Sequence, residues 1–187
     1  MLISVGVDVG GRNGAIAIIN TNMKILYLSN APYYEVENKN KKLKPKLNKT
    51  TGMYEDRFSS RAWTDFKELG NIYKPYLKHD IVYTVEKVSV RPHEGEISSF
   101  IFGDSLGIHR GMYNYLNPVA YFEPTPQAWK KAMKVTSNKD TSIEMAEELF
   151  QCNLKDYKTH GKVDDLAEAL LLAFYGLMKH LEEVGEI

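Results

Sequence analysis

The chain has 187 residues, 43% hydrophobic and 26% charged, which is the size and composition of one globular domain. Basic and acidic residues number 24 each, so the net charge neither indicates nor excludes a nucleic-acid partner. The single cysteine, Cys152, excludes an intrachain disulfide and a cysteine zinc cage, and is typical of a reducing compartment. No apolar run is as long as a membrane span, and the N-terminus lacks a basic leader, so a soluble cytoplasmic protein is expected.

The first thirty residues predict an antiparallel meander. Three runs rich in β-branched side chains are separated by short turns, and we expect strands near 2–9, 13–20 and 23–29. Short turns join neighbouring strands in antiparallel order.

A lysine-rich segment interrupts this pattern at about 33–58. The stretch "NKNKKLKPKLNK" contains six lysines and no acid, and it has little to bury. We interpret it as an exposed loop or a mobile hairpin. Two roles remain open for it, a solvated surface insertion and an arm that contacts phosphates.

The second half alternates between helices and strands. Helical spacing of apolar residues begins at about residue 60 with Trp63, and Thr125 is expected to cap a short helix in "TPQAWKKAM". Further helices are expected at about 95–116, in "SNKDTSIEMAEELF" and at 164–183, with strands near 81–87 and in "VAYFEP". This order predicts one α/β domain over 1–187, with parallel crossovers added to the meander in a single mixed sheet.

Asp8 is the first candidate site residue. A lone carboxylate in an apolar strand is costly unless it is paired, hydrogen-bonded or bound to a metal. Asp8 shares its face of the strand with Gly6 and Gly10, whose small size would leave room for a ligand. The alternative is a strand-end aspartate that accepts hydrogen bonds from the turn "GGRNG".

Glu86 repeats this arrangement at the end of "IVYTVE". Ligands of open α/β sheets gather beyond the carboxyl ends of the strands. The alternative is an ion pair with Lys87 or Arg91 at the surface.

A third acidic group lies in "VDDLAEALLLAFYG". Asp165 and Glu168 share a helix face with Leu172, which indicates that this face looks into a cleft. The alternative is a capping box in which Asp165 caps the helix. Carboxylates from three segments would suit Mg²⁺ or Mn²⁺, and two such ions can activate water against a phosphodiester.

Five segments in succession resemble the motifs of RuvC-type Holliday junction resolvases, and most closely the small phage-borne branch of that family. They are "GVDVGGRNGAIAII", "TVEKV", "SSFIFGDSLGIHRG", "TPQAWKKAMKV" and "DDLAEALLLAFYG". The resemblance covers nearly the whole chain except the lysine-rich insertion. It implies a ribonuclease H-like fold, with a five-stranded mixed sheet of three antiparallel strands and then parallel strands, flanked by helices.

The resemblance also implies an activity and its partners. The activity is that of a crossover junction endodeoxyribonuclease, a homodimer that hydrolyses phosphodiesters in paired nicks at four-way or other branched DNA. Four carboxylates would hold two Mg²⁺ or Mn²⁺ ions, with no nucleotide cofactor and no membrane partner. A phage-encoded enzyme of this kind would act in the host cytoplasm.

By position, Asp8 matches the acid of the first strand and Glu86 the acid that closes the fourth. Asp165 and Glu168 match the paired acids of the last helix, and Asp164 is the alternative to Asp165. Glu168 stands where the best-studied RuvC enzymes have Asp, so its longer side chain would shift the ligand geometry. His160 is expected in the loop before this helix.

Basic residues of the family lie near the scissile strand, and here they correspond to candidate DNA contacts at Arg91, Lys130, Lys131, Lys134 and Lys139. For each lysine, the alternative is a solvated helix face. Trp129 is expected in the core. Three glycines, Gly103, Gly107 and Gly111, clear one face of a helix either for a dimer interface or for packing within the monomer.

Three other functions compete with the resolvase. A non-catalytic protein that binds branched DNA would keep the lysines and lose the acids, whereas this acid set is complete. An RNA-directed nuclease of the same fold remains open. An actin-like phosphotransferase is excluded because it needs a second similar domain.

Overall fold

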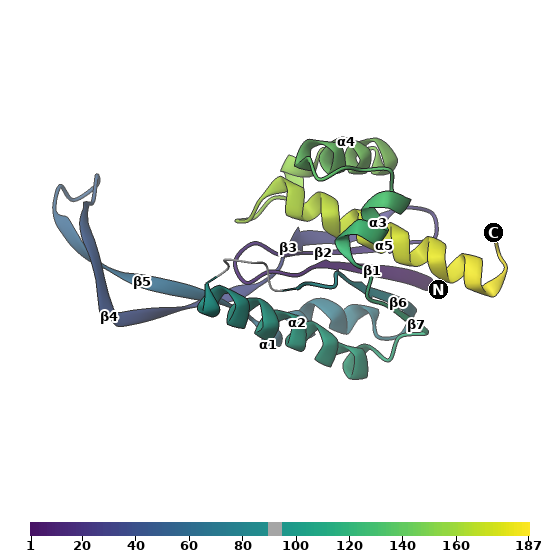
Figure 1. The fold of residues 1–187 in the computed structure, drawn as a ribbon, viewed down its shortest axis with the longest axis horizontal. Coiled ribbons are helices and arrows are strands. Elements are labelled where there is room, and N and C mark those ends of the chain that lie inside the picture. The colour runs from purple at the N-terminus through teal and green to yellow at the C-terminus, as the bar shows by residue number, and fades with distance from the viewer. Residues whose placement is uncertain (90–94) are drawn as a thin grey trace.

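The computed structural model describes residues 1–89 and 95–187, and it places a central sheet between two layers of helices (Figure 1). The strands are β1 (Leu2–Asp8), β2 (Ala15–Asn20), β3 (Ile25–Asn30), β4 (Tyr33–Leu47), β5 (Tyr54–Thr64), β6 (Asp80–Val85) and β7 (Ala120–Phe122). The helices are α1 (Phe66–Tyr73), α2 (Glu96–Leu116), α3 (Pro126–Ala132), α4 (Lys139–Phe150) and α5 (Val163–Val184), with 3-10 turns η1 (Lys74–Tyr76) and η2 (Leu154–Tyr157).

The central sheet has the strand order β3-β2-β1-β6-β7 over the described residues. β1 pairs antiparallel with β2 and parallel with β6, and β6 pairs parallel with β7. The predicted five-stranded mixed sheet is therefore confirmed. Because β1 and β6 run in the same direction, their carboxyl ends lie at one edge of the sheet.

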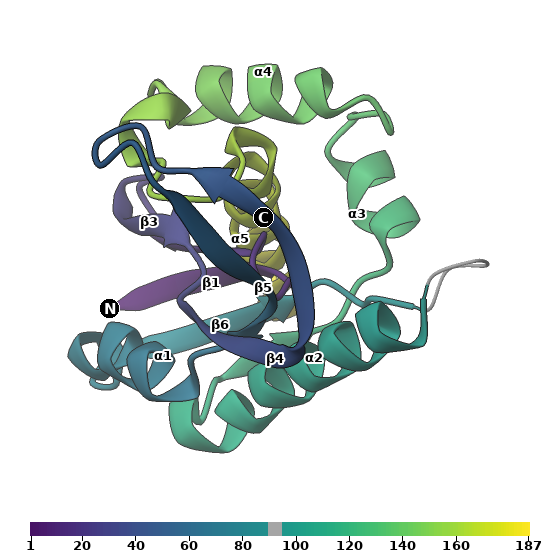
Figure 2. The same cartoon turned by 90° about the vertical axis from the view of Figure 1, so that its left-hand side faces the viewer.

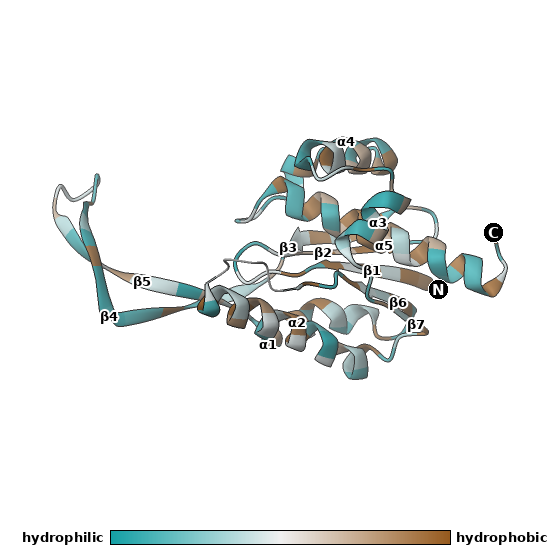
Figure 3. Ribbon diagram, viewed as in Figure 1, coloured by the Kyte–Doolittle hydropathy of each residue, from teal (hydrophilic) through white to brown (hydrophobic). Residues whose placement is uncertain are grey.

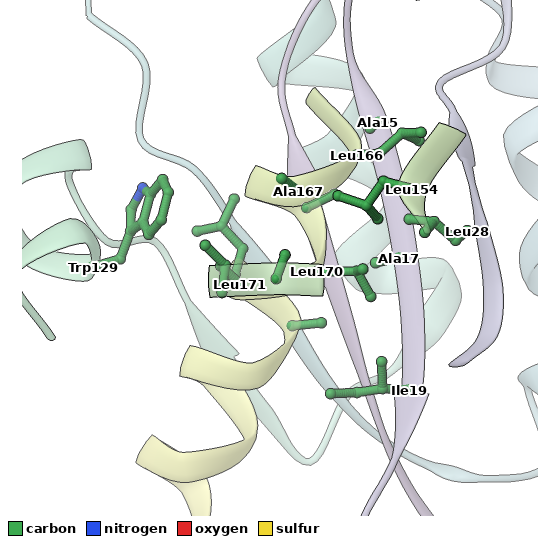
Figure 4. Close-up of a cluster of buried hydrophobic side chains, with 14 of the residues drawn as sticks. Ala15, Ala17, Ile19, Leu28, Trp129, Leu154, Leu166, Ala167, Leu170 and Leu171 are labelled. Atoms are coloured by element: carbon green, nitrogen blue, oxygen red, sulfur yellow. The ribbon is translucent and has the colours of Figure 1, made fainter. Parts of the chain in front are cut away.

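Each face of the sheet has its own core. Val5 and Val7 of β1 belong to the cluster that α1 and α2 cover. On the other face, Leu166 and Leu170 of α5 pack against Ala17 of β2 (Figure 4). α5 is therefore buried over most of its first three turns, and its N-terminus is held against the edge where β1 ends.

The glycines beside Asp8 serve packing, which corrects the prediction that they leave room for a ligand. A Cβ atom at Gly6 would lie under 3.0 Å from the backbone of Ala169 and Ala173 in α5. A Cβ atom at Gly10 would collide in the same way with a carbonyl of the β1–β2 turn. The two glycines thus allow the helix and the turn to approach the strand closely.

Residues 33–64 form a long exposed hairpin. β4 and β5 pair antiparallel, with register shifts between Asn38 and Lys42 and between Leu43 and Lys46. The hairpin interpretation is confirmed, but the helical reading from residue 60 is wrong, because Trp63 lies in β5. The helix begins only at Phe66, where the Asp65 side chain accepts from two backbone N–H groups.

The helices expected at about 95–116 and 164–183 correspond to α2 and α5. Thr125 caps α3 as predicted, with its hydroxyl accepting from the Ala128 N–H at 3.3 Å. Within the two described ranges, no helix is long and apolar enough to cross a membrane.

Candidate active site

Three segments bring carboxylates to the edge of the sheet where β1 and β6 end. Asp8 is the last residue of β1, and Glu86 follows β6, with its N–H donating to the Val7 carbonyl at 3.0 Å. Asp165 lies in the first turn of α5. These three side chains are buried, and Glu168 is half-buried one turn further along α5.

The acids interact electrostatically. Burial, together with the negative charges of Glu86, Glu168 and Asp165, raises the pKa of Asp8 well above its usual value, and the Lys139 charge opposes this rise. Burial also raises the pKa of Asp165, against a hydrogen bond from the Lys162 backbone. The structure therefore brings together all four acids that the sequence pointed to.

Three acids of this region, Glu86, Glu168 and Asp164, are held by nearby donors. The Trp129 indole N–H donates to Glu86 Oε1 at 2.8 Å. Lys130 Nζ donates to Glu168 Oε1 at 2.7 Å, and Lys139 forms an ion pair with Asp164. Lys130 and Lys139, expected as DNA contacts, thus lie within the acidic site itself.

Asp165 and the adjacent Asp164 have different surroundings. Asp165 Oδ2 accepts from the Lys162 backbone N–H at 3.0 Å, and its charge acts on Asp8. Asp164 is held instead by Lys139. The N-cap of α5 is Lys162, so Asp165 is not the cap itself; the expected capping box is present with Asp165 at its third helical position, where the carboxylate accepts from the backbone N–H of the cap.

The remaining predicted residues lie farther out. Lys131 and Lys134 are exposed on and just after α3. His160 lies in the loop before α5 as expected, and its ring packs edge-on against Tyr33 with centroids 4.8 Å apart. Arg91 falls outside the described residues.

Sequence reasoning missed two residues that support the site. Trp129 is fully buried, as predicted for the core, but its indole also orients Glu86. Asn30, at the end of β3, accepts from the Thr159 N–H at 3.2 Å and donates to the Lys162 carbonyl at 3.4 Å. The only signal for Asn30 was an amide side chain in an apolar strand.

The donor set fits a hard divalent cation by its chemistry, since four carboxylates crowd one another, and burial together with this crowding raises the pKa of Asp8. The side-chain positions do not enclose an ion, because among the described residues no three His, Cys, Asp or Glu side chains form such a group. Lys130 and Trp129 contact oxygens of Glu168 and Glu86 that a cation would need.

A cavity of about 460 Å³ opens beside Glu86. It lies between the segment that follows β6, the start of α3 and α2, and it is lined by Glu86, Lys87, Val88, Ser89, Phe102, Thr125, Pro126 and Gln127. This volume is in the range of small-ligand sites and adjoins one of the four acids.

No family model matches the chain, and no curated protein sequence matches it. Its fold does match solved structures. Thermus thermophilus RuvC in complex with a Holliday junction substrate aligns with a TM-score of 0.57 and 10% identity, over 99% of this chain and 97% of that one. This chain has a RuvC-like fold.

Two further structures share the RuvC-like fold. A second Thermus thermophilus RuvC structure aligns with a TM-score of 0.51 and 16% identity, over 98% of this chain and 96% of that one. The yeast mitochondrial Holliday junction resolvase Ydc2 aligns with a TM-score of 0.52 and 17% identity, over 98% and 80%. These matches agree with the ribonuclease H-like fold that the sequence resemblance implied.

Proposed function

We propose that this protein is a metal-dependent, structure-selective DNA endonuclease that resolves Holliday junctions, and other branched DNA, by paired nicks. The observation that carries this proposal is the convergence of four carboxylates from three segments at one edge of a RuvC-like sheet. The proteins that share the fold include a RuvC bound to a Holliday junction substrate and a mitochondrial Holliday junction resolvase.

Asp8, Glu86, Asp165 and Glu168 would hold two divalent ions, Mg²⁺ or Mn²⁺. When bound, such ions activate water and stabilise charge on the leaving oxygen of a phosphodiester. Lys130 and Lys139 balance part of the negative charge in the site, which lowers the cost of bringing a phosphate close to the carboxylates.

A second copy of the chain would pack on α2. A Cβ atom at Gly103, Gly107 or Gly111 would meet open space, so the alternative of packing within the monomer is wrong. Phe100 and Tyr115, on the same helix, are 65% and 43% exposed. A twofold dimer would place two sites on opposing strands of a junction, as paired nicks require.

The test is cleavage of a labelled four-way DNA junction, with linear duplex as a control, in Mg²⁺, in Mn²⁺ and in chelator. We expect symmetric nicks at the junction that depend on the metal. Asp8→Asn should lower the cleavage rate by several orders of magnitude and keep junction binding, because it removes a metal ligand. Asp156→Asn, at an exposed acid of η2, is the matched control and should cleave normally.

Full cleavage by Asp8→Asn would contradict the assignment. A non-catalytic branched-DNA-binding protein is the second candidate, and the ion pair Lys130–Glu168 favours it because it engages one acid of the site. Junction binding without cleavage in either metal would support that candidate. Cleavage of structured RNA or an RNA/DNA hybrid alone would indicate an RNA-directed nuclease.

A further inference from the structure

The β4–β5 hairpin concentrates positive charge. Residues 33–64 contain eight basic and four acidic residues, whereas the whole chain has 24 of each, so the rest of the chain is net acidic. Figure 3 shows hydrophilic colouring along most of this hairpin. A neutral protein thus carries a basic arm on an acidic body, and the arm is the part suited to an anionic partner.

Most of this charge is available for binding. Lys42 pairs with Asp56 at 2.7 Å, and Glu55 accepts from the Asn48 amide at 2.6 Å. The other lysines of the hairpin are exposed and have no ion pair within the described part of the chain: Lys39, Lys41, Lys44, Lys46 and Lys49. These five ammonium groups surround the two register shifts and the turn.

The root of the hairpin is joined to the loops that lead into the acidic site. Arg12, in the β1–β2 turn that follows Asp8, pairs with Glu35 and lies 5.9 Å from the ring centroid of Tyr33. Tyr33 in turn packs on His160, in the loop before α5. The hairpin therefore projects from the edge of the sheet that carries the acids, as Figures 1 and 2 show.

We propose that the hairpin is an arm that binds the phosphate backbone of a DNA duplex extending from the acidic site. This inference rests on the proposed function and adds a second DNA contact to it. A duplex presents one negative charge per roughly 1.7 Å of its axis, so a row of lysines can neutralise several phosphates without reading the sequence. The fifteen residues of β4 have a contour length of roughly 50 Å at about 3.3 Å per residue, and the strand bends along its length (Figure 1).

The exposure of the hairpin agrees with a partner of this kind. An isolated two-stranded hairpin is marginally stable in water. Beyond its root, both faces of β4 are exposed, and Tyr54 near the turn is 74% exposed. Neutralisation of the lysines by phosphates would order this arm when DNA is bound.

The experiment compares two triple variants in chelator, so that binding is measured without cleavage. Lys41, Lys44 and Lys46 are each changed to Gln, which leaves the Lys42–Asp56 pair intact. The matched control changes Lys24, Lys74 and Lys78 to Gln, three exposed lysines at the opposite edge of the sheet. Affinity for a four-way junction and for linear duplex is measured between roughly 50 and 200 mM salt.

The hairpin variant should bind the junction on the order of tenfold more weakly, and its plot of log affinity against log salt should be shallower by up to about 3. The control variant should match wild type. Replacing the same three hairpin lysines by Arg should restore both affinity and slope. In a footprint, wild type should protect up to about ten more base pairs of one arm than the Gln variant does.

The outcomes separate this inference from the proposed function. If wild type cuts junctions and the hairpin variant binds them with the same affinity and the same salt dependence as wild type, the hairpin is not a DNA-binding arm and the proposed function still stands. If junction binding depends on the hairpin lysines but no cleavage occurs in Mg²⁺ or Mn²⁺, the DNA-binding role of the hairpin is supported and the proposed nuclease activity is overturned. Hairpin-dependent binding to vesicles containing phosphatidylserine, with none to DNA, would overturn the arm as a DNA contact.

Discussion

In the central sheet, Ile16, Ile18 and Tyr83 are fully buried, whereas Met53 and Tyr54 in the hairpin are 67% and 74% exposed. The body is stabilised by apolar surface buried on both faces of one sheet. The hairpin has buried side chains only near its root, at Ala62 and Thr64 among its described residues. Its charge and length can therefore change with little effect on the folding of the body.

The sharpest test of this difference compares one glycine from each region. Gly6→Ala places a Cβ atom under 3.0 Å from the backbone of α5, and neither side can move without separating helix and strand. We expect a loss on the order of 4 kcal/mol in the free energy of unfolding, measured by urea denaturation.

Gly52 is the matched position in the hairpin turn, with φ of +69° and open space around it. Gly52→Ala costs about 1 kcal/mol of local strain, because L-residues disfavour this conformation. The global denaturation midpoint should stay unchanged. Equal midpoint shifts in the two variants would contradict the separation between body and hairpin.

Acid should weaken the body through His109. Burial lowers the pKa of His109 from 6.5 to about 4, and the Tyr83 hydroxyl lies 3.5 Å from its Nδ1. In the unfolded state, the His109 imidazole is protonated below about pH 6.5. In the folded state it is protonated only below about pH 4. Stability should therefore fall across this window, by roughly 3 kcal/mol in total.

His109→Gln should remove most of this pH dependence, which denaturation at pH 7 and pH 4.5 would measure against wild type. Asp8 and Asp165 oppose the trend, since their raised pKa values make folding more favourable as they protonate. The comparison between variant and wild type cancels their contribution. A fall in stability of equal size in His109→Gln would refute the assignment of this pH dependence to His109.

A small effect is also expected at Leu47, toward the far end of the hairpin. Leu47 is 44% exposed, so Leu47→Ser should change the free energy of unfolding by less than about 0.5 kcal/mol. The same urea titration serves as the measurement. A loss above about 1 kcal/mol would show that this end of the hairpin stabilises the global fold.

Much of the fold was predictable because local patterns encode burial. The apolar run of β1 and the helical stripe of α5 are both visible in the sequence, and they produced the mixed sheet and its last helix. The helical prediction at Trp63 was wrong because β5 lacks strict apolar alternation. Its register comes from pairing with β4, which local periodicity does not encode.

The four candidate acids were identifiable from the sequence because each stands next to apolar residues, where an unpaired charge is costly. Their partners were not. Lys130 reaches Glu168 across 38 positions and Lys139 reaches Asp164 across 25, so these pairs depend on how α3, α4 and α5 pack.

By itself, the sequence determined the order of strands and helices in the body and the carboxylates at its edge, because burial periodicity and isolated charges are local properties. Only the tertiary structure decided that Gly6 serves the approach of α5, that lysines enter the acidic site, and that the hairpin is rooted beside it. Those features arise from contacts between distant segments, whose geometry the packing of the sheet sets.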